Sequence, residues 1–506
     1  MANMQAEIQT APQLLGKDLQ PGINVIGYLR AINGTAQGSR LLLGALEQTG
    51  IPFTTIDYKA SPSQVGRDVA ERRDGLPIYD INLLCVNADM TPQFARDAGP
   101  EIFLNRYTIG TWAWETEELP PALFGALDFV DEVWVPSDYS RDAVQKVTSK
   151  PVFTFHHPIA PPSVNESATR SDLNLPEAYT FLFIFDYFSV ARRKNAEGLV
   201  SAFTRAFKLG EGPVLVIKTI NADARREEAD VLRQAASGRG DIKIIDRYLP
   251  ANDKDALIGL CDCYVSLHRA EGFGLTLAEA MSLGKPVIAT GYSGNLEFMT
   301  EDNSYLVKWQ PKLVGGDSSI YPATGRWAEP DIADAARLMR HVYEHQDEAA
   351  ARARKGRSAI EEGFSASTQA KVIEHRVNEI RQGPLKVVAR GGDGWAYATA
   401  MQKAALALAR GPQVDMPTQS DGAYGAVSRG YRRMLRRLMR NSWVYQQEIG
   451  NSLLQALREV DAKRQREAAE TSRRMDEVES SMREISASLR RIEDELARAL
   501  DRRNGA

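Results

Sequence analysis

The chain has 506 residues, of which 43% are hydrophobic and 25% charged, with a formal net charge of −4 at pH 7. One hydrophobic core does not usually serve so long a chain, so the length predicts roughly two to four domains. The small net charge gives no basic field of the kind that nucleic-acid-binding proteins carry, and we expect no nucleic-acid partner. Neither a signal-peptide pattern nor an apolar run of about 18 residues is found, which favours a cytoplasmic location.

From Gly22 onward, short apolar runs alternate with helical patterns, which is typical of βαβ units with a parallel sheet. One helix is predicted over residues 39–50, ending at Gly50. We assign residues 22–158 to a first α/β domain, which follows an N-terminal extension at residues 1–21. Its predicted strands lie at residues 23–29, 53–58, 81–87, 132–137 and 151–155.

A proline-rich stretch at residues 156–162 predicts a hinge, after which the alternation begins again. We assign residues 163–383 to a second α/β domain, with a helix at 195–208 and closing helices at 332–383 that pack back over both domains. Parallel sheets of this kind bind ligands at the carboxyl ends of their strands, so we expect the two domains to face each other across a cleft. The predicted strands of the second domain lie at residues 180–186, 213–220, 242–247, 263–268 and 286–291.

The C-terminal part of the chain has a different character. Beyond a predicted linker at residues 384–425, residues 426–447 hold six closely spaced arginines among apolar side chains. Such a basic amphipathic helix suits either an anionic membrane surface or an acidic face of the protein itself. Within residues 448–503, apolar residues recur at steps of three and four from Met475 to Leu496, which predicts a coiled coil. We expect a homo-oligomer formed through it, or else a heterologous partner helix.

The segment HRAEGFGLTLAEAMSLGKPVIATGYSGN, residues 268–295, places a glycine-rich turn between a strand and a helix predicted at 275–283. Gly272 and Gly274 let backbone N–H groups approach a ligand, and the helix amino terminus adds partial positive charge, which together suit a phosphate. Glu271 precedes the helix and Glu279 lies just over one turn inside it, so they can bracket a diphosphate with hydroxyl groups on both sides. A nucleotide sugar has this pattern. Alternatively, the two glutamates only favour the helix dipole.

Glu271 and Glu279 resemble the E-x7-E motif of retaining glycosyltransferases of family four. Residues 185–207 resemble a second signature of that family, in which a basic pair ahead of a helix grips the diphosphate. GYLRAINGTAQGSRLLLGAL and IGTWAWETEELP are similar to the amino-terminal half of a bacterial branch of the family. The likeness covers about residues 22–383. It implies the GT-B fold, two Rossmann-like domains facing across a cleft, followed here by the helical and coiled-coil extension.

The resemblance implies that Glu271 contacts hydroxyl groups of the donor sugar and that Glu279 contacts the ribose. Lys194, with Arg193 beside it, would neutralise the charge that develops on the leaving diphosphate, so these two cations and Glu271 are the catalytic candidates. The phosphates would be held by the backbone of the turn and the helix start: Gly272, Phe273, Gly274 and Leu275.

Further donor-side candidates are Gly34, Lys218, His268 and Asn295, where Asn295 is also expected to cap the next helix. Lys218 and His268 are as readily explained by structural roles. Trp114 and Glu115 are the acceptor-side candidates, although a Trp-x-Trp pair also suits a core.

Two departures from the bacterial branch are Ala36 and Gln37, which stand where a glycine and a glutamate are usual. They leave the chemistry of the acceptor side open.

No metal is expected, because Cys261 and Cys263 lack a second ligand pair and family members of this fold generally work without one.

We predict a retaining, hexosyltransferase-type glycosyltransferase that uses a nucleotide-diphosphate sugar, in cell-surface polysaccharide or glycan synthesis. The acceptor would be a glycan or a lipid-linked molecule, and the chain would be cytoplasmic or peripheral on the inner face of the membrane. The alternatives are a non-catalytic transferase-like scaffold organised by its coiled coil, and a same-fold nucleotide-sugar epimerase or phosphorylase.

Overall fold

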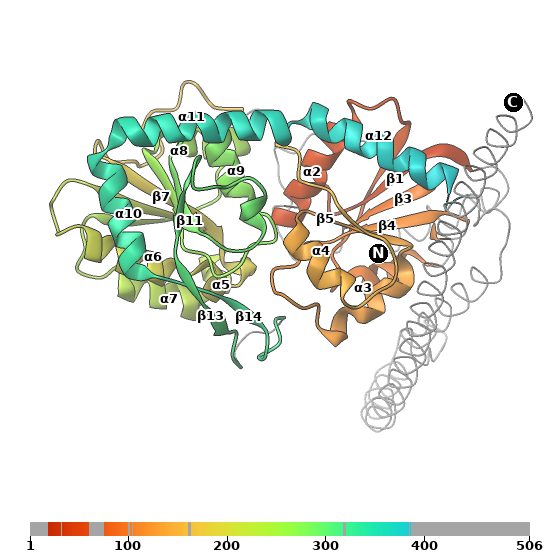
Figure 1. The fold of residues 1–506 in the computed structure, drawn as a ribbon, viewed down its shortest axis with the longest axis horizontal. Helices are drawn as coiled ribbons and strands as arrows, with labels where there is room; N and C mark the ends of the chain where they lie inside the picture. Colours follow the sequence, from red (N-terminus) through yellow and green to blue (C-terminus); the bar gives the residue numbers. More distant parts are fainter. Residues whose placement is uncertain are drawn as a thin grey trace, which may run out of the picture. The chain divides into compact units, whose positions relative to one another are not determined.

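The computed structural model describes residues 19–31, 33–59, 75–99, 102–103, 105–159, 163–316, 320–383 and 385 (Figure 1). The predicted basic helix and coiled coil lie outside these residues, as do nearly all of the linker and most of the N-terminal extension. Among the described residues, no helix has the length and apolar character needed to cross a bilayer. All three cysteines are buried free thiols.

The first sheet has six parallel strands in the order β2-β1-β3-β4-β5-β6, as the predicted βαβ units require. Val25 of the inner strand β1 lies opposite Thr55 of β2 and Leu83 of β3. The helices beside this sheet are α2 (Gly34–Leu46), α3 (Thr91–Ala98) and α4 (Asp138–Gln145), with the 3-10 helix η3 (Pro121–Phe129). The strands are β1 (Gln20–Gly27), β2 (Phe53–Asp57), β3 (Tyr79–Cys85), β4 (Tyr107–Thr111), β5 (Glu132–Val135) and β6 (Val152–Thr154).

The second sheet repeats this plan, with six parallel strands in the order β12-β11-β10-β7-β8-β9. Its strands are β7 (Thr180–Asp186), β8 (Val214–Ile220), β9 (Ile242–Asp246), β10 (Cys263–Ser266), β11 (Val287–Thr290) and β12 (Tyr305–Val307). Its helices are α5 (Ala191–Lys194), α6 (Ala196–Ala206), α7 (Arg226–Ala235), α8 (Ala251–Leu260), α9 (Leu275–Ser282), α10 (Ile332–Glu344) and α11 (Gln346–Gly363), with short 3-10 helices at Tyr187–Ser189, Ala222–Ala224 and Gly294–Glu297. A separate antiparallel hairpin, β13 (Trp309–Leu313) and β14 (Arg326–Pro330), follows β12.

Helix α2 begins five residues earlier than the sequence pattern predicts. The side chain of Asn33 caps it by accepting a hydrogen bond from the Ala36 amide at 2.8 Å, so the helix starts at Gly34. Both departures from the bacterial branch therefore lie in the first turn of a helix and not in a loop. Ala36 is fully buried in the first-domain core, whereas Gln37 is half-buried and accepts a hydrogen bond from Arg40 at 3.0 Å.

The last of the closing helices packs on the first domain. Helix α12 (Ala366–Gln382) lies beside α2, and its Ile373, Val377 and Ile380 belong to the first-domain core (Figure 1). An ion pair anchors it, because Arg376 donates two hydrogen bonds, at 2.8 and 2.7 Å, to the carboxylate of the buried Glu132. Tyr107 and Trp134 donate two more at 2.9 and 2.7 Å, which compensate the carboxylate for the lost water.

Replacing Arg376 with alanine would leave the Glu132 carboxylate buried without its cation. Removing one partner of a buried ion pair typically costs about 3–5 kcal/mol, so we expect Arg376→Ala to lower the free energy of unfolding of the first domain by that amount. Urea denaturation followed by tryptophan fluorescence measures it. Arg357→Ala, which removes an exposed pair with Glu361 on α11, is the control and should change stability little. Equal effects of the two substitutions would contradict the anchoring role of Glu132.

Candidate functional site

A cleft of about 1430 Å³ lies between the two sheets and is lined by residues of both domains. Asp57, Thr111, Asp186 and Ile220 are the last residues of β2, β4, β7 and β8, and all four line it. The cleft is therefore at the carboxyl ends of the parallel strands, where the sequence places it.

The glycine turn between β10 and α9 forms one wall of this cleft. Gly274 occupies the N-cap position with a φ of +95°, a conformation that residues with a Cβ rarely adopt, and it offers α9 no side-chain cap. Gly272 to Leu275 all line the cleft, so the positive end of the helix dipole opens into it. A second loop packs tightly behind the turn, because a Cβ at Gly294 would lie 2.2 Å from the carbonyl oxygen of Gly272.

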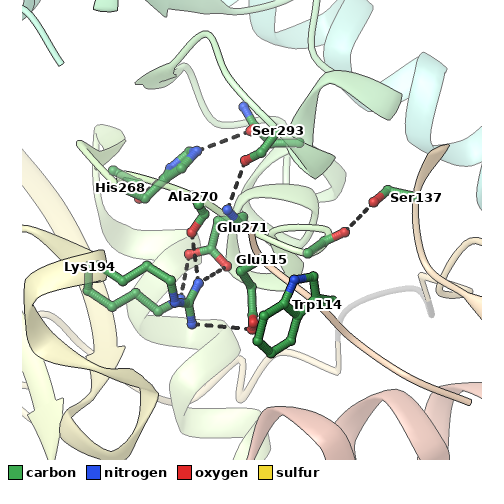
Figure 2. Close-up of polar contacts among 12 residues, drawn as sticks. Trp114, Glu115, Ser137, Lys194, His268, Ala270, Glu271 and Ser293 are labelled. Atoms are coloured by element: carbon green, nitrogen blue, oxygen red, sulfur yellow. Dashed lines mark hydrogen bonds and ion pairs between the residues drawn. The ribbon is translucent and has the colours of Figure 1, made fainter. Parts of the chain in front are cut away.

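The carboxylate of Glu271 lies between two cations from α5 (Figure 2). Its Oε2 accepts a hydrogen bond from Arg193 Nη1 at 3.0 Å, and its Oε1 accepts one from Lys194 Nζ at 2.5 Å. Arg193 also donates to the Ala270 carbonyl at 2.8 Å. The strands that precede these residues, β7 and β10, are neighbours in the sheet, which brings positions 77 and 78 residues apart into contact.

This arrangement sets the ionisation of the cluster. Burial alone would raise the pKa of Glu271, but Lys194 and Arg193 lower it to about 2, so the carboxylate is charged throughout the neutral range. Burial lowers the pKa of Lys194, and Glu271 opposes that shift. Lys194 has three N–H donors and uses one on Glu271, which leaves donors for an anionic ligand.

Glu279, on the cleft side of α9, has one satisfied and one unsatisfied oxygen. Its Oε1 is 2.7 Å from Nζ of Lys254 on α8, whereas its Oε2 is buried with no hydrogen-bond partner among the described residues. A buried carboxylate oxygen without a donor is costly, so Glu279 Oε2 is available to accept a hydrogen bond from a group in the cleft.

Lys218 of β8 is buried and lines the cleft on the same side as Glu279. Burial lowers its pKa to about 8, despite the opposing effect of Asp186 and Asp246. Gly34 also lines the cleft, as the first residue of α2 on the opposite wall. Both residues are placed where a bound ligand would reach them.

His268 and Asn295 do not line the cleft, and Figure 2 shows His268 away from Trp114 and Glu115. His268 is fully buried, with Nε2 facing Asn295 Oδ1 at 3.1 Å and the Tyr292 carbonyl at 3.3 Å. Because Nε2 faces two acceptors, it carries the proton, and Nδ1 accepts a hydrogen bond from the Ser266 hydroxyl at 3.1 Å. Burial lowers the pKa of His268, which favours the neutral form of the ring. Asn295 does not cap the following helix, because its amide donates to the Thr290 carbonyl at 3.1 Å. The structure thus gives both residues a supporting role.

The acceptor-side candidates contact the second domain. Glu115 Oε1 is 3.6 Å from Arg193 Nη2, and its Oε2 accepts a hydrogen bond from Tyr321 at 3.0 Å. Trp114 is 3% exposed, donates its indole N–H to the Glu118 carbonyl at 2.8 Å and packs against Tyr321 with ring centroids 5.4 Å apart. Trp114 is therefore mostly core, with an edge in the cleft wall.

His157 and Tyr321 are among the cleft residues that the sequence analysis did not identify. His157 lines the cleft three residues after the end of β6. Its ring is edge-on to Phe273 and would lie 2.6 Å from a Cβ at Gly38. Its position after a strand was an available signal, since other cleft residues also follow strands. Burial lowers its pKa to about 4, so the ring is neutral at pH 7. Tyr321 lies in the segment that joins β13 to β14, and no local pattern marks it.

Part of the chain is similar to a known protein family. Residues 176–358 match the family model described as glycosyl transferases group 1, and this segment contains Glu271, Glu279, Arg193 and Lys194. No curated protein sequence matches the chain. Within the described residues, no group of three or more His, Cys, Asp or Glu side chains is placed to hold a metal ion.

Solved structures resemble most of the described chain. HepE of Anabaena, in complex with UDP and glucose, is 14% identical with a TM-score of 0.52, and the match covers 71% of this chain and 100% of HepE. Sucrose-phosphate synthase of Thermosynechococcus elongatus is 16% identical, with a TM-score of 0.53 and coverage of 72% and 100%. A glycosyltransferase of Rickettsia africae is 13% identical, with a TM-score of 0.52 and coverage of 72% and 100%. At these identities the likeness concerns the fold, and the chain has the predicted GT-B fold.

The Glu271 cluster predicts unequal costs for two substitutions. Glu271→Ala would leave Arg193 buried without its carboxylate, so we expect a loss of about 3–5 kcal/mol in the free energy of unfolding of the second domain. Glu271→Gln keeps an acceptor oxygen near Arg193 and should cost clearly less. Urea denaturation of both variants measures the difference, and equal losses would show that a neutral acceptor at this position does not compensate Arg193 for the lost carboxylate. Glu271→Gln is consequently the better variant for testing function.

Proposed function

We propose that this chain is a retaining glycosyltransferase of family four, of hexosyltransferase type, which transfers a sugar from a nucleotide-diphosphate sugar to an acceptor hydroxyl. The observation that carries the proposal is the pairing of Glu271 with Arg193 and Lys194 beside the uncapped amino terminus of α9, with the unsatisfied oxygen of Glu279 one turn further along. The match of residues 176–358 to group 1 glycosyl transferases supports it.

In the proposed complex, the diphosphate lies at the amino terminus of α9, near Lys194 and Lys218. The fixed anion Glu271 accepts hydrogen bonds from sugar hydroxyls, and Glu279 Oε2 accepts one from the ribose. The acceptor oxygen attacks the anomeric carbon on the face that the diphosphate leaves. The bond to the diphosphate oxygen breaks, and the acceptor proton passes to that oxygen. Because the cations and the helix dipole already stabilise the leaving charge, we expect donor binding without a divalent metal.

The acceptor-binding part of the cleft lies on the first-domain side. We place it between Glu115 and the first-domain wall, and we propose a glycan or lipid-linked acceptor of cell-surface polysaccharide synthesis, supported only by the basic helix predicted in the sequence. A non-catalytic scaffold is less consistent with the site, since Ala36 belongs to the core and the charged cluster is complete.

Nucleotide release from a donor panel tests the proposal. UDP sugars come first because the similar Anabaena structure holds UDP and glucose. Lys194→Ala removes a cation that stabilises the leaving group, so we expect turnover to fall by about 10²–10³-fold. Lys208→Ala, which removes an exposed lysine away from the cleft, is the control. Release that is unaffected by Lys194→Ala and Glu271→Gln would contradict the proposed site.

The lowered pKa of Lys218 predicts a pH dependence of nucleotide binding. The free lysine loses its proton as the pH rises through about 8, whereas a bound diphosphate favours the charged form and raises the pKa. The affinity for UDP should therefore fall above about pH 8, by up to about tenfold per pH unit, with proton uptake on binding. Isothermal titration calorimetry in two buffers measures both effects. Lys218→Met should abolish this pH dependence, and its persistence in that variant would assign it to another group.

A further inference from the structure

The hairpin β13–β14 is fixed to the same short helix that carries the catalytic cations. Trp327 of β14 is buried, and the guanidinium groups of Arg192 and Arg269 lie 5.5 and 5.7 Å from the centre of its ring. Arg192 of α5 also donates to the Val314 carbonyl at 2.9 Å, and Arg269 binds both oxygens of Glu329 at 2.8 and 2.9 Å. Because Arg193 and Lys194 follow Arg192 directly, the hairpin contacts the helical turn that carries both cations.

The hairpin reaches the first domain through Tyr321. The side chain is 3% exposed, its ring packs against Trp114, and its hydroxyl donates to Glu115 Oε2 at 3.0 Å. The other oxygen of Glu115 faces Arg193 at 3.6 Å. Glu115 follows β4 of the first sheet, so the series Tyr321–Glu115–Arg193–Glu271 starts in the second domain, enters the first and returns.

The Glu115 carboxylate needs the hydrogen bond that the Tyr321 hydroxyl donates. Its side chain is 19% exposed, and a carboxylate that loses most of its water needs donors at both oxygens. The pair with Arg193 supplies one oxygen at a distance that is too long for a strong hydrogen bond. Tyr321 supplies the other with a charge-assisted hydrogen bond, which is the stronger and more directional of the two contacts.

We propose that Tyr321 is a positioning residue for the reaction. Its hydroxyl holds Glu115 in the conformation that faces Arg193, so that the first domain completes the Arg193–Glu271 pair when the cleft is closed. Tyr321 itself does not bind the nucleotide, which Lys218, Glu279 and α9 contact from the second domain. The catalytic part of this proposal rests on the proposed glycosyl transfer, but the brace between the domains does not.

Tyr321→Phe tests the brace, because it keeps the ring packing and removes only the hydroxyl. Tyr343→Phe is the matched control, since Tyr343 packs in the second domain and does not line the cleft. We expect Tyr321→Phe to raise amide hydrogen exchange in residues 112–119 by about tenfold in the nucleotide-free full-length chain, as the loss of a hydrogen bond to a charged group implies. Exchange at the wild-type rate overturns the proposal, whatever the turnover.

Kinetics then separate positioning from structural support. We expect Tyr321→Phe to lower kcat of nucleotide release about tenfold, with KM for the donor and the affinity for UDP unchanged. In a Glu115→Ala background, which lacks the acceptor of the Tyr321 hydroxyl, the same substitution should have little further effect, because the two residues act as one unit. Additive losses, or a rise in donor KM with kcat unchanged, overturn the proposed role. Failure of the wild-type chain to bind UDP would instead refute the proposed function, and the exchange experiment would still decide on the brace.

Discussion

The pairing of Glu271 with Arg193 and Lys194 is the constraint on which the rest of the site depends. Three charged groups are brought out of water. Glu271 pairs with both cations, and Arg193 is held further by the Ala270 carbonyl and by Glu115. Their positions follow from the sheet, since β7 and β10 are adjacent and end at the same edge. The carboxylate is therefore held as a charged acceptor beside the helix terminus, while Lys194 keeps donors for an anion.

A second layer of contacts ties the first domain to this cluster. Ser137 donates to the Gly272 carbonyl at 2.6 Å, the Asp138 amide donates to Glu297 at 2.6 Å, and Glu115 faces Arg193. On the other side, α12 is held on the first domain by Glu132 and Arg376. The chain therefore crosses between the domains twice. In the described structure, Ser137 of the first domain contacts the glycine turn of the second.

Much of the fold could be predicted because both faces of the central strands are buried, so that runs such as TFLFIFD are continuous and apolar. Strand β4, YTIGT, was not predicted, because Thr108, Gly110 and Thr111 interrupt its apolar pattern. Strand β12 was not predicted because it is short. Of the site, the Glu271 turn and the Arg193–Lys194 pair could be predicted from their local patterns. The partners of Glu115 could not, because Tyr321 is 206 residues away and meets it only through the packing of the hairpin.

A crystal structure of the chain with a bound nucleotide sugar is the most direct test of the central claim, which is that the Glu271 cluster is the donor site. We predict the diphosphate at the amino terminus of α9 within hydrogen-bonding distance of Lys194 Nζ, the sugar hydroxyls on Glu271, and the ribose on Glu279 Oε2. A nucleotide sugar bound with its diphosphate away from α9, and with the Glu279 oxygen still unsatisfied, would contradict it.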